Sequence, residues 1–348
     1  MSVLAQMGRA RANLLCRLNV VSHRTFVLPL VMFSVTARCN SRCVSCDWWQ
    51  HGGEDDLTLA EIETLVAELS TLGTRVAVLT GGEPLTRPDI FDVAERFRRA
   101  GIVLELLTSG LAVERHASSI ARHFRRVIVS IDGPDRERYK AVRGVDGLPA
   151  VEAGILALRA ADRRVGVSVR CTLHRTNFRD LPRMISLARR LDVDRISFLA
   201  ADLGSDAFGR DMDVACDGLR LSPEDVREFE DLVEATVRTY RAEFESGFVA
   251  ESPQKLRRLP RYYAAVLGEA PFPPVECNAP WVSVVIEADG RVRPCFFQEP
   301  VGSVRREGLS WLAGRVLPDV RRSLDVASDG ICERCVCTLR VGLRKAPW

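Results

Sequence analysis

The stretch Val31-Met-Phe-Ser-Val-Thr-Ala-Arg-Cys-Asn-Ser-Arg-Cys-Val-Ser-Cys46 joins an apolar segment directly to a CxxxCxxC triplet. The apolar, partly β-branched start of this stretch predicts a buried strand. The three thiols, Cys39, Cys43 and Cys46, then fall within a short loop at the end of that strand. Three thiolates so close together can wrap one face of a cubane iron–sulfur cluster and leave the fourth iron without a protein ligand.

The cysteine content supports a metal or redox role. The chain has 348 residues and 11 cysteines, and its N-terminal apolar run is too interrupted by polar residues for a secretory signal. A cytoplasmic, reducing location follows, where clustered cysteines hold metals more often than they form disulfides. For the triplet, the alternative to an iron–sulfur cluster is a zinc site with His51 as the fourth ligand.

Composition narrows the class of protein. Hydrophobic residues make up 47% of the chain and charged residues 27%, which is ordinary for a globular protein of about two domains. No run reaches the ~18 apolar residues of a membrane-spanning helix. A net charge of +3 without a basic block gives no electrostatic footprint for a nucleic acid, so no nucleic-acid partner is expected.

Apolar runs alternate with helix-period segments from residue 31 onward. This alternation predicts parallel βαβ construction, either as an open sheet or as a whole or partial barrel, with the chemistry at the C-terminal ends of the strands. The expected strands are 31–36, 75–79, 103–107, 126–131, 166–173 and 195–199, and the expected helices are 58–72, 89–100, 112–123, 150–161 and 179–191.

The two ends of the chain have their own signals. The first 30 residues predict a basic amphipathic helix, which either lies on a membrane surface or packs against the body of the protein. Segment 201–222 is polar and rich in Gly and Asp, as in a loop over the strand ends or a linker, and a long helix is expected over 223–246, opened by Ser222 and Pro223.

A second group of cysteines surrounds a predicted hairpin. Segments 282–286 and 291–294 flank Asp289-Gly290, a strong hairpin signal, and the hairpin would bring Cys277 and Cys295 together. The tail adds Cys332, Cys335 and Cys337, so a closed four-thiolate site is expected. Spacing alone leaves zinc and a 4Fe–4S cluster equally open here.

A second motif follows the second predicted strand, where Thr80-Gly-Gly-Glu-Pro84 stands. Together with the triplet, it makes residues 31–200 resemble the radical S-adenosylmethionine (SAM) superfamily. The resemblance implies an α/β fold built on a partial (β/α)6 TIM-like barrel. It also implies a 4Fe–4S cluster on Cys39, Cys43 and Cys46 whose unique iron binds SAM, with Gly81, Gly82, Glu83 and Pro84 holding the methionyl amino group.

Further positions are similar to the family's SAM contacts. One departure is Ser45, which stands where the family often has an aromatic residue; Trp48 or Trp49 would have to take its place near the adenine. The SAM contacts implied by the resemblance are Ser109 in Thr108-Ser-Gly110, Ser130 and Asp132 in Ser130-Ile-Asp-Gly133, Arg143 before Gly144, and Arg170 on the fifth strand.

The C-terminal cysteines resemble the SPASM/twitch auxiliary-cluster domain, a small α+β unit of a β-hairpin plus a helix. The resemblance implies a single auxiliary 4Fe–4S cluster, and so two clusters in the chain. Its implied ligands are Cys277, Cys295, Cys332 and Cys335, with Cys337 as the alternative to Cys335. The expected organisation is an amphipathic extension over 1–30, the barrel over 31–200, a linker with helices over 201–274 and the auxiliary-cluster domain over 275–348.

The resemblance also implies a reaction. One electron, supplied by a donor such as flavodoxin or ferredoxin, cleaves SAM to a 5′-deoxyadenosyl radical that abstracts hydrogen from a substrate, and the auxiliary cluster takes an electron back. A small-molecule substrate, oxidised or rearranged, ranks first because the 38 residues before Cys39 are too few for a leader-peptide-binding domain. A lipid-linked or peptide substrate is the alternative, and a non-catalytic zinc protein is the alternative of another class. No general base stands out among the five histidines. His174 and Asn177, after the fifth strand, are candidates, and a purely structural role is the alternative for both.

Overall fold

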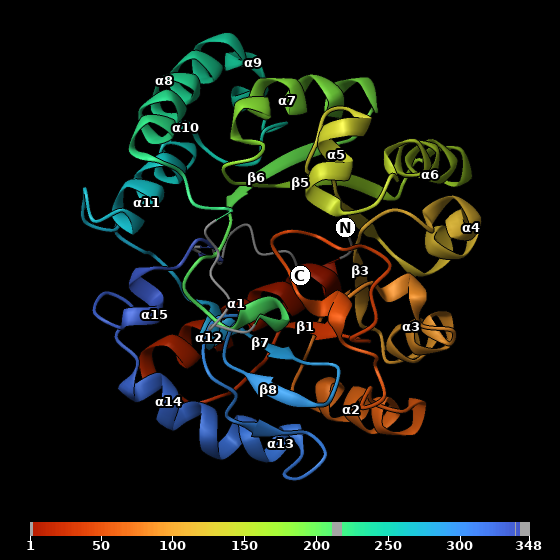
Figure 1. Ribbon diagram of the computed structural model, residues 1–348. Coiled ribbons are helices and arrows are strands. Elements are labelled where there is room, and N and C mark those ends of the chain that lie inside the picture. Colours follow the sequence, from red (N-terminus) through yellow and green to blue (C-terminus); the bar gives the residue numbers. More distant parts are fainter. Residues whose placement is uncertain (1–2, 211–217, 338, 342–348) are drawn as a thin grey trace.

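One curved sheet organises the protein. The computed structural model describes all residues except 1–2, 211–217, 338 and 342–348. Six parallel strands follow one another around the sheet in sequence order, with helices outside them, so the expected partial (β/α)6 barrel is confirmed (Figure 1). These strands are β1 (Leu30–Ser34), β2 (Val76–Thr80), β3 (Val103–Thr108), β4 (Arg126–Ser130), β5 (Gly166–Leu173) and β6 (Arg195–Ala200).

The outer helices bury one side of every strand. Alternate residues such as Phe33, Leu79 and Leu106 are fully buried against them in one continuous core. Thr58 and Glu61 form the capping box that begins the first outer helix, as their spacing predicts. The outer layer consists of α2 (Leu59–Thr71), α3 (Ile90–Arg99), α4 (Val113–His123), α5 (Arg136–Arg143), α6 (Leu148–Ala161) and α7 (Leu181–Arg190).

The predicted C-terminal hairpin forms and joins the barrel sheet. Strand β7 (Ser283–Ile286) pairs in parallel with β1, and β8 (Arg291–Arg293) and β9 (Gly302–Ser303) continue antiparallel beyond it. The hairpin thereby covers the edge of β1, whose backbone groups would otherwise lack partners. The turn residues predict a hairpin, whereas its docking on β1 has no local sequence signal.

The remaining helices lie between β6 and the tail. The helix opened by Ser222 ends at Thr239, and a short helix follows after Tyr240, so the single helix expected over 223–246 is broken once. These helices are α8 (Pro223–Thr239), α9 (Arg241–Glu245), α10 (Pro253–Leu256), α11 (Arg258–Val266), α12 (Ala279–Val282), α13 (Leu309–Trp311), a π-helical turn (Leu312–Val316), α14 (Leu317–Ser323) and α15 (Gly330–Glu333).

Helix α1 (Val3–Ser22) packs against the body of the protein on one side. Ala12 and Cys16 join a second buried cluster with Leu30 and Val76, which begin β1 and β2. The buried Asn19 amide donates to the carbonyl oxygens of Val27 and Trp281. α1 therefore covers the end of the barrel at which the strands begin. Among the described helices, none is long and apolar enough to cross a membrane.

Candidate functional site

The triplet loop lies at the C-terminal end of β1, as expected. Cys39, Cys43 and Cys46 are half-buried, and their thiols are close enough that charge on one raises the pKa of another. Burial is the larger effect, and it raises the pKa of Cys39 to about 11 and that of Cys46 to about 12. A backbone N–H, that of Ser41, points at Cys39 Sγ from 3.4 Å.

The Gly-Gly pair after β2 packs against this loop. The N–H of Gly82 donates to the carbonyl of Thr36, and that of Glu83 to the carbonyl of Arg38, at 2.9 and 2.7 Å. A Cβ on Gly81 would lie 2.2 Å from the Thr36 oxygen, and one on Gly82 would lie 2.2 Å from the Arg38 oxygen. The glycines are therefore required by the close approach of two backbone segments, one of which leads into the triplet.

The Arg143-Gly144 pair holds the other side of the triplet loop. Arg42 N donates to the carbonyl of Arg143 at 2.9 Å, and Val44 N to that of Val142 at 3.0 Å. Gly144 has φ +69° at the end of α5, and a Cβ there would lie 2.2 Å from the Arg42 oxygen. The Arg143-Gly144 pair therefore supports the triplet loop through its backbone. This role is not evident from its resemblance to a SAM-binding motif.

The Glu83 carboxylate is buried and receives hydrogen bonds from β3 and from its own turn. Thr108 Oγ1 donates to Oε1 at 2.7 Å, and Leu85 N donates to the same oxygen at 3.0 Å. Ser109 N donates to Oε2 at 2.6 Å, while the Ser109 hydroxyl donates to Asn40. A carboxylate has about four lone-pair positions, so one acceptor position on Oε2 is left.

Asp132 and Arg143 form a buried pair beneath the triplet. Arg143 donates to Asp132 Oδ2 at 3.1 Å, and Oδ1 accepts from Thr172 N at 2.7 Å. Burial opposes the charge on Arg143, but the neighbouring Cys43 and Asp132 raise its pKa. Within the described part of the chain, Arg143 Nε has no hydrogen-bond partner.

Ser130 and Arg170 come together on the inner face of the sheet. They are register partners on β4 and β5, so their side chains lie on the same face. Arg170 Nε is 3.5 Å from Ser197 Oγ on β6. This face is opposite to the one that packs on the outer helices.

The second cysteine group also converges. Charge on Cys335 would raise the pKa of both Cys277 and Cys295, and Cys295 in turn acts on Cys332, although burial is the main cause of the raised pKa values. The Cys337 thiol is also buried, and the charges that act on its pKa are, largest first, those of Arg170, Lys255 and Cys277. Cys337 therefore lies near Arg170 of β5 and also near Cys277 of the second group.

The loop after β6, residues 201–210, reaches the triplet. The carbonyl oxygen of Phe208 is 3.5 Å from Cys46 Sγ, which donates to it, and Arg210 donates to the carbonyl of Ser45 at 2.6 Å. Segment 201–222 was expected to cover the strand ends or to act as a linker. Residues 201–210 lie over the end of β1, next to the triplet.

The ring of Phe208 contacts the segment that follows Cys295 of the second cysteine group. It stacks on Phe296 with 6.0 Å between ring centroids and meets Phe297 edge-on at 6.1 Å, and both follow Cys295 in the chain. Phe208 has φ +68°, an uncommon backbone conformation for an aromatic residue. Sequence analysis missed this residue; a single aromatic side chain within a polar segment was the available signal.

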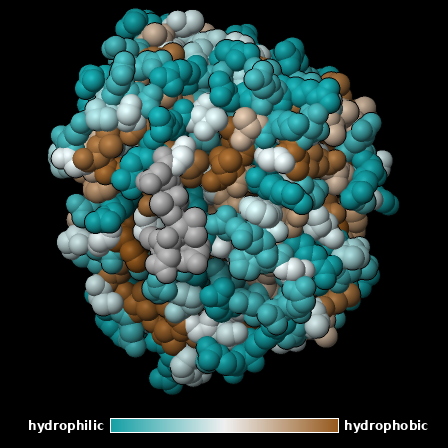
Figure 2. Space-filling view, in the orientation of Figure 1, coloured by the Kyte–Doolittle hydropathy of each residue, from teal (hydrophilic) through white to brown (hydrophobic). Residues whose placement is uncertain are grey.

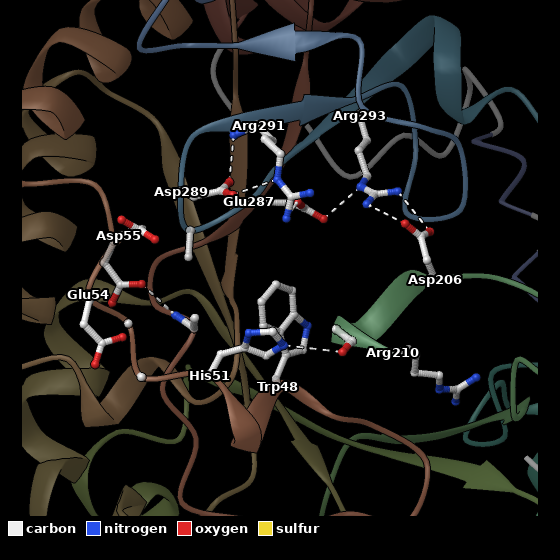
Figure 3. A pocket seen from close by; sticks show the side chains of 16 residues that line it. Trp48, His51, Glu54, Asp55, Asp206, Arg210, Glu287, Asp289, Arg291 and Arg293 are labelled. Atoms are coloured by element: carbon white, nitrogen blue, oxygen red, sulfur yellow. Dashed lines mark hydrogen bonds and ion pairs between the residues drawn. The ribbon is translucent and has the colours of Figure 1, made fainter. Parts of the chain in front are cut away.

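A polar cavity of about 280 Å³ opens between the 201–210 loop and the segments that flank the triplet (Figure 3). Arg293 reaches across it to Glu287 at 2.8 Å and to Asp206 at 3.1 Å, so the hairpin is tied to the 201–210 loop. Trp48 and His51 line another wall, with His51 Nε2 at 3.4 Å from the carbonyl oxygen of Gly209. Among the described residues, His51 does not join the triplet in a group that could hold a metal ion, so the structure gives no support to His51 as a zinc ligand.

Comparison with protein families decides the identity of these domains. Residues 33–188 match the model of the radical SAM superfamily, and residues 277–336 match SPASM, an iron–sulfur cluster-binding domain. The chain contains a radical SAM domain and a SPASM domain. These two domains imply 4Fe–4S clusters and SAM as cofactors.

Curated relatives of this radical SAM chain have different substrates. It is 33% identical over 167 residues to the AdoMet-dependent heme synthase of Methanosarcina barkeri, covering 47% of either chain. It is 34% identical over 175 residues to the GTP 3′,8-cyclase of Marinobacter nauticus, covering 49% of this chain and 52% of the relative. The chain thus spans about half the length of the curated relatives it matches.

Solved radical SAM structures share the fold. The structure of Streptococcus suis SuiB bound to S-adenosylmethionine superposes with a TM-score of 0.61 at 13% identity, covering 92% of this chain and 75% of SuiB. At this identity, the likeness concerns the fold alone.

The donor atoms fit the clusters that the two domains imply. Both groups present thiols, which are the ligands of 4Fe–4S clusters. Among the described residues, no three Cys, His, Asp or Glu side chains converge closely enough to hold a single metal ion.

Proposed function

We propose that Cys39, Cys43 and Cys46 hold the SAM-binding 4Fe–4S cluster of this enzyme. The observation that carries the proposal is the double clamp on the triplet loop, by Gly82 and Glu83 on one side and by Val142 and Arg143 on the other. When bound, the cluster and SAM supply a one-electron cleavage to methionine and a 5′-deoxyadenosyl radical, which abstracts a hydrogen atom from the substrate. The chain supplies the rigid loop that positions both.

The residues around the loop divide into proposed SAM contacts and supports. Glu83, presented by Gly81, Gly82 and Pro84, has one acceptor position left for the SAM ammonium group. Ser130 and Arg170 lie side by side on the inner face, where a hydroxyl and a guanidinium suit a carboxylate. Ser109, Asp132 and Arg143 are occupied by Asn40, Thr172 and each other, so we assign them the role of holding the pocket in shape.

The second group is proposed to hold the auxiliary 4Fe–4S cluster on Cys277, Cys295, Cys332 and Cys335. Charge on Cys335 acts on Cys277 and Cys295, two members of this set, whereas the charges that act most on Cys337 are those of Arg170 and Lys255, ahead of Cys277. Phe208 contacts both cysteine loops, which favours a role for the auxiliary cluster as electron acceptor from a substrate bound between them.

The substrate is proposed to be a small molecule that is oxidised or rearranged. Two curated relatives at 33–34% identity are named for heme synthesis and GTP cyclisation, which are small-molecule reactions. An external one-electron donor of the flavodoxin or ferredoxin kind would reduce the first cluster, in keeping with a cytoplasmic location.

The decisive experiment is anaerobic purification followed by iron and sulfide analysis and a SAM-cleavage assay. About eight irons per chain and dithionite-driven release of 5′-deoxyadenosine are expected. The C39A/C43A/C46A variant should lose the release, whereas Cys16→Ala, which removes a buried thiol outside both groups, should keep it. Cleavage by the triple variant would refute the site, and colourless zinc-loaded protein would support the non-catalytic alternative.

A further inference from the structure

The outward side of α1 is apolar and basic. Leu14, Leu18 and Val21 follow one stripe of the helix at i, i+4 and i+7, and their exposed fractions are 58%, 41% and 80%. Phe26, just beyond the helix, is 47% exposed. Large apolar side chains gathered on one exposed surface mark a docking site more often than scattered ones do. Figure 2, in the orientation of Figure 1, shows hydrophobic side chains in several separate groups among hydrophilic ones.

The charged residues of α1 and of the segment that follows it are all basic, although Glu276 and Asp325 line a hollow together with Arg17 and Val21. Arg11 and Arg17 lie on the exposed side of α1, and Arg24 follows it. Among the described residues, none of these three guanidinium groups has an ion-pair partner, although the chain forms many arginine–carboxylate pairs elsewhere. From Met1 to Cys46 the sequence has six arginines and no aspartate or glutamate. Free cations beside an apolar stripe complement an anionic surface with an apolar interior.

We propose that this face of α1 binds the surface of an anionic phospholipid bilayer. Leu18 and Val21, with Leu14 and Phe26, would enter the boundary between headgroups and acyl chains, and the arginines would contact the phosphates. The opposite side of α1 is fixed by Asn19 and by its packing on Leu30 and Val76, so the stripe is held in place before binding. Insertion of the apolar side chains and attraction of the arginines to the phosphates are each weak. Together they would give reversible attachment to the bilayer.

Attachment here leaves the proposed site accessible. α1 covers the end of the barrel at which the strands begin, and the triplet lies where β1 ends. The membrane is therefore proposed as a place of recruitment, and the hydrogen abstraction itself does not depend on it.

Vesicle sedimentation with the full chain tests the proposal. Wild-type protein is expected to bind phosphatidylcholine vesicles containing about 30% phosphatidylserine, at least tenfold more weakly without phosphatidylserine, and more weakly at high salt. The L18S/V21S and R11E/R17E variants should each reduce binding about tenfold or more. Leu156→Ser, at a 60% exposed leucine of α6, should bind like wild type.

Three outcomes would overturn the proposal: no binding by wild type, equal binding to uncharged vesicles, or equal binding by all variants. Dimerisation that L18S/V21S abolishes, seen by light scattering without vesicle binding, would assign the face to a second copy instead. All variants should retain iron and SAM cleavage, so a failure of vesicle binding is distinguishable from a failure of the proposed function.

Discussion

The backbone carbonyl oxygen of Phe208 lies 3.5 Å from Cys46 Sγ, although the two residues are 162 positions apart in the chain. The ring of the same phenylalanine stacks against Phe296, one residue after Cys295. A single side chain and its backbone therefore contact the loops of both cysteine groups. Phe208 therefore contacts both the loop at the mouth of the barrel and the SPASM domain.

Substituting Phe208 should disturb both proposed clusters. Phe208→Ala removes the ring contacts and keeps the unfavourable positive φ, so both ligand loops lose support. Phe208→Gly removes the ring but relieves the backbone, so we expect it to preserve the first cluster better than alanine does. Electron paramagnetic resonance of the reduced protein, with iron content, measures each cluster separately.

The matched control for Phe208 is Phe91→Ala. Phe91 is also half-buried and also contacts two rings, those of His116 and His123, on the outer layer. It should lower stability without changing either spectrum. Unchanged spectra in Phe208→Ala would show that the contact between the loops has no influence on the clusters.

Gly144→Ala should weaken the triplet loop. The new Cβ would meet the Arg42 carbonyl oxygen and would also sit at φ +69°. Gly101 has φ +75° after α3 but has open space around its Cβ position, so Gly101→Ala isolates the cost of the backbone conformation, about 1 kcal/mol. We expect Gly144→Ala to lose about 3 kcal/mol or more of unfolding free energy and part of its iron. Equal losses in the two variants, measured by urea unfolding, would argue against the clamp.

The fourth ligand of the auxiliary cluster can be decided by comparing two alanine variants. Cys335→Ala should lose the auxiliary cluster, about four irons per chain, because its thiol lies with the other three. Cys337→Ala should keep about eight irons, since the charges of Arg170 and Lys255 act on its thiol more strongly than that of Cys277 does. The reverse pattern in iron analysis would assign Cys337 as the ligand.

His174 should make the protein less stable in mild acid. Burial lowers the pKa of His174 to about 4, so between pH 6.5 and 4 the unfolded chain binds a proton that the folded chain does not. Stability therefore falls as the pH drops through this window, by about 3 kcal/mol at most. His174→Asn can still accept the hydrogen bond that Thr176 N donates to the imidazole, and it should remove this part of the pH dependence.

The control for His174 is His116→Asn, because His116 lies on the outer layer and is less deeply buried. Burial also lowers the pKa of His116, so urea unfolding at pH 5 and pH 7 should show a reduced slope in both variants, with the larger reduction in the His174 variant. The same slope in wild type and the His174 variant would place the acid sensitivity elsewhere.

Local signals were enough to predict the barrel and to identify the motifs at the ends of its strands. The six strands and the capping box at Thr58 follow from apolar patterning and short-range hydrogen bonding, which depend only on neighbours in the chain. Cys39, Cys43 and Cys46 and the Thr80–Pro84 turn were recognisable for the same reason: each motif lies within one loop at a strand end.

The roles of several motif residues were decided only by tertiary structure. The sequence indicated that Gly81, Gly82 and Gly144 matter, but their reason is the approach of two backbones, which depends on segments distant in the chain. The docking of β7 on β1 and the contact of Phe208 with both cysteine loops are likewise long-range. A sequence pattern records which face of an element is apolar, whereas the partner of that face is chosen by the packing of the whole chain.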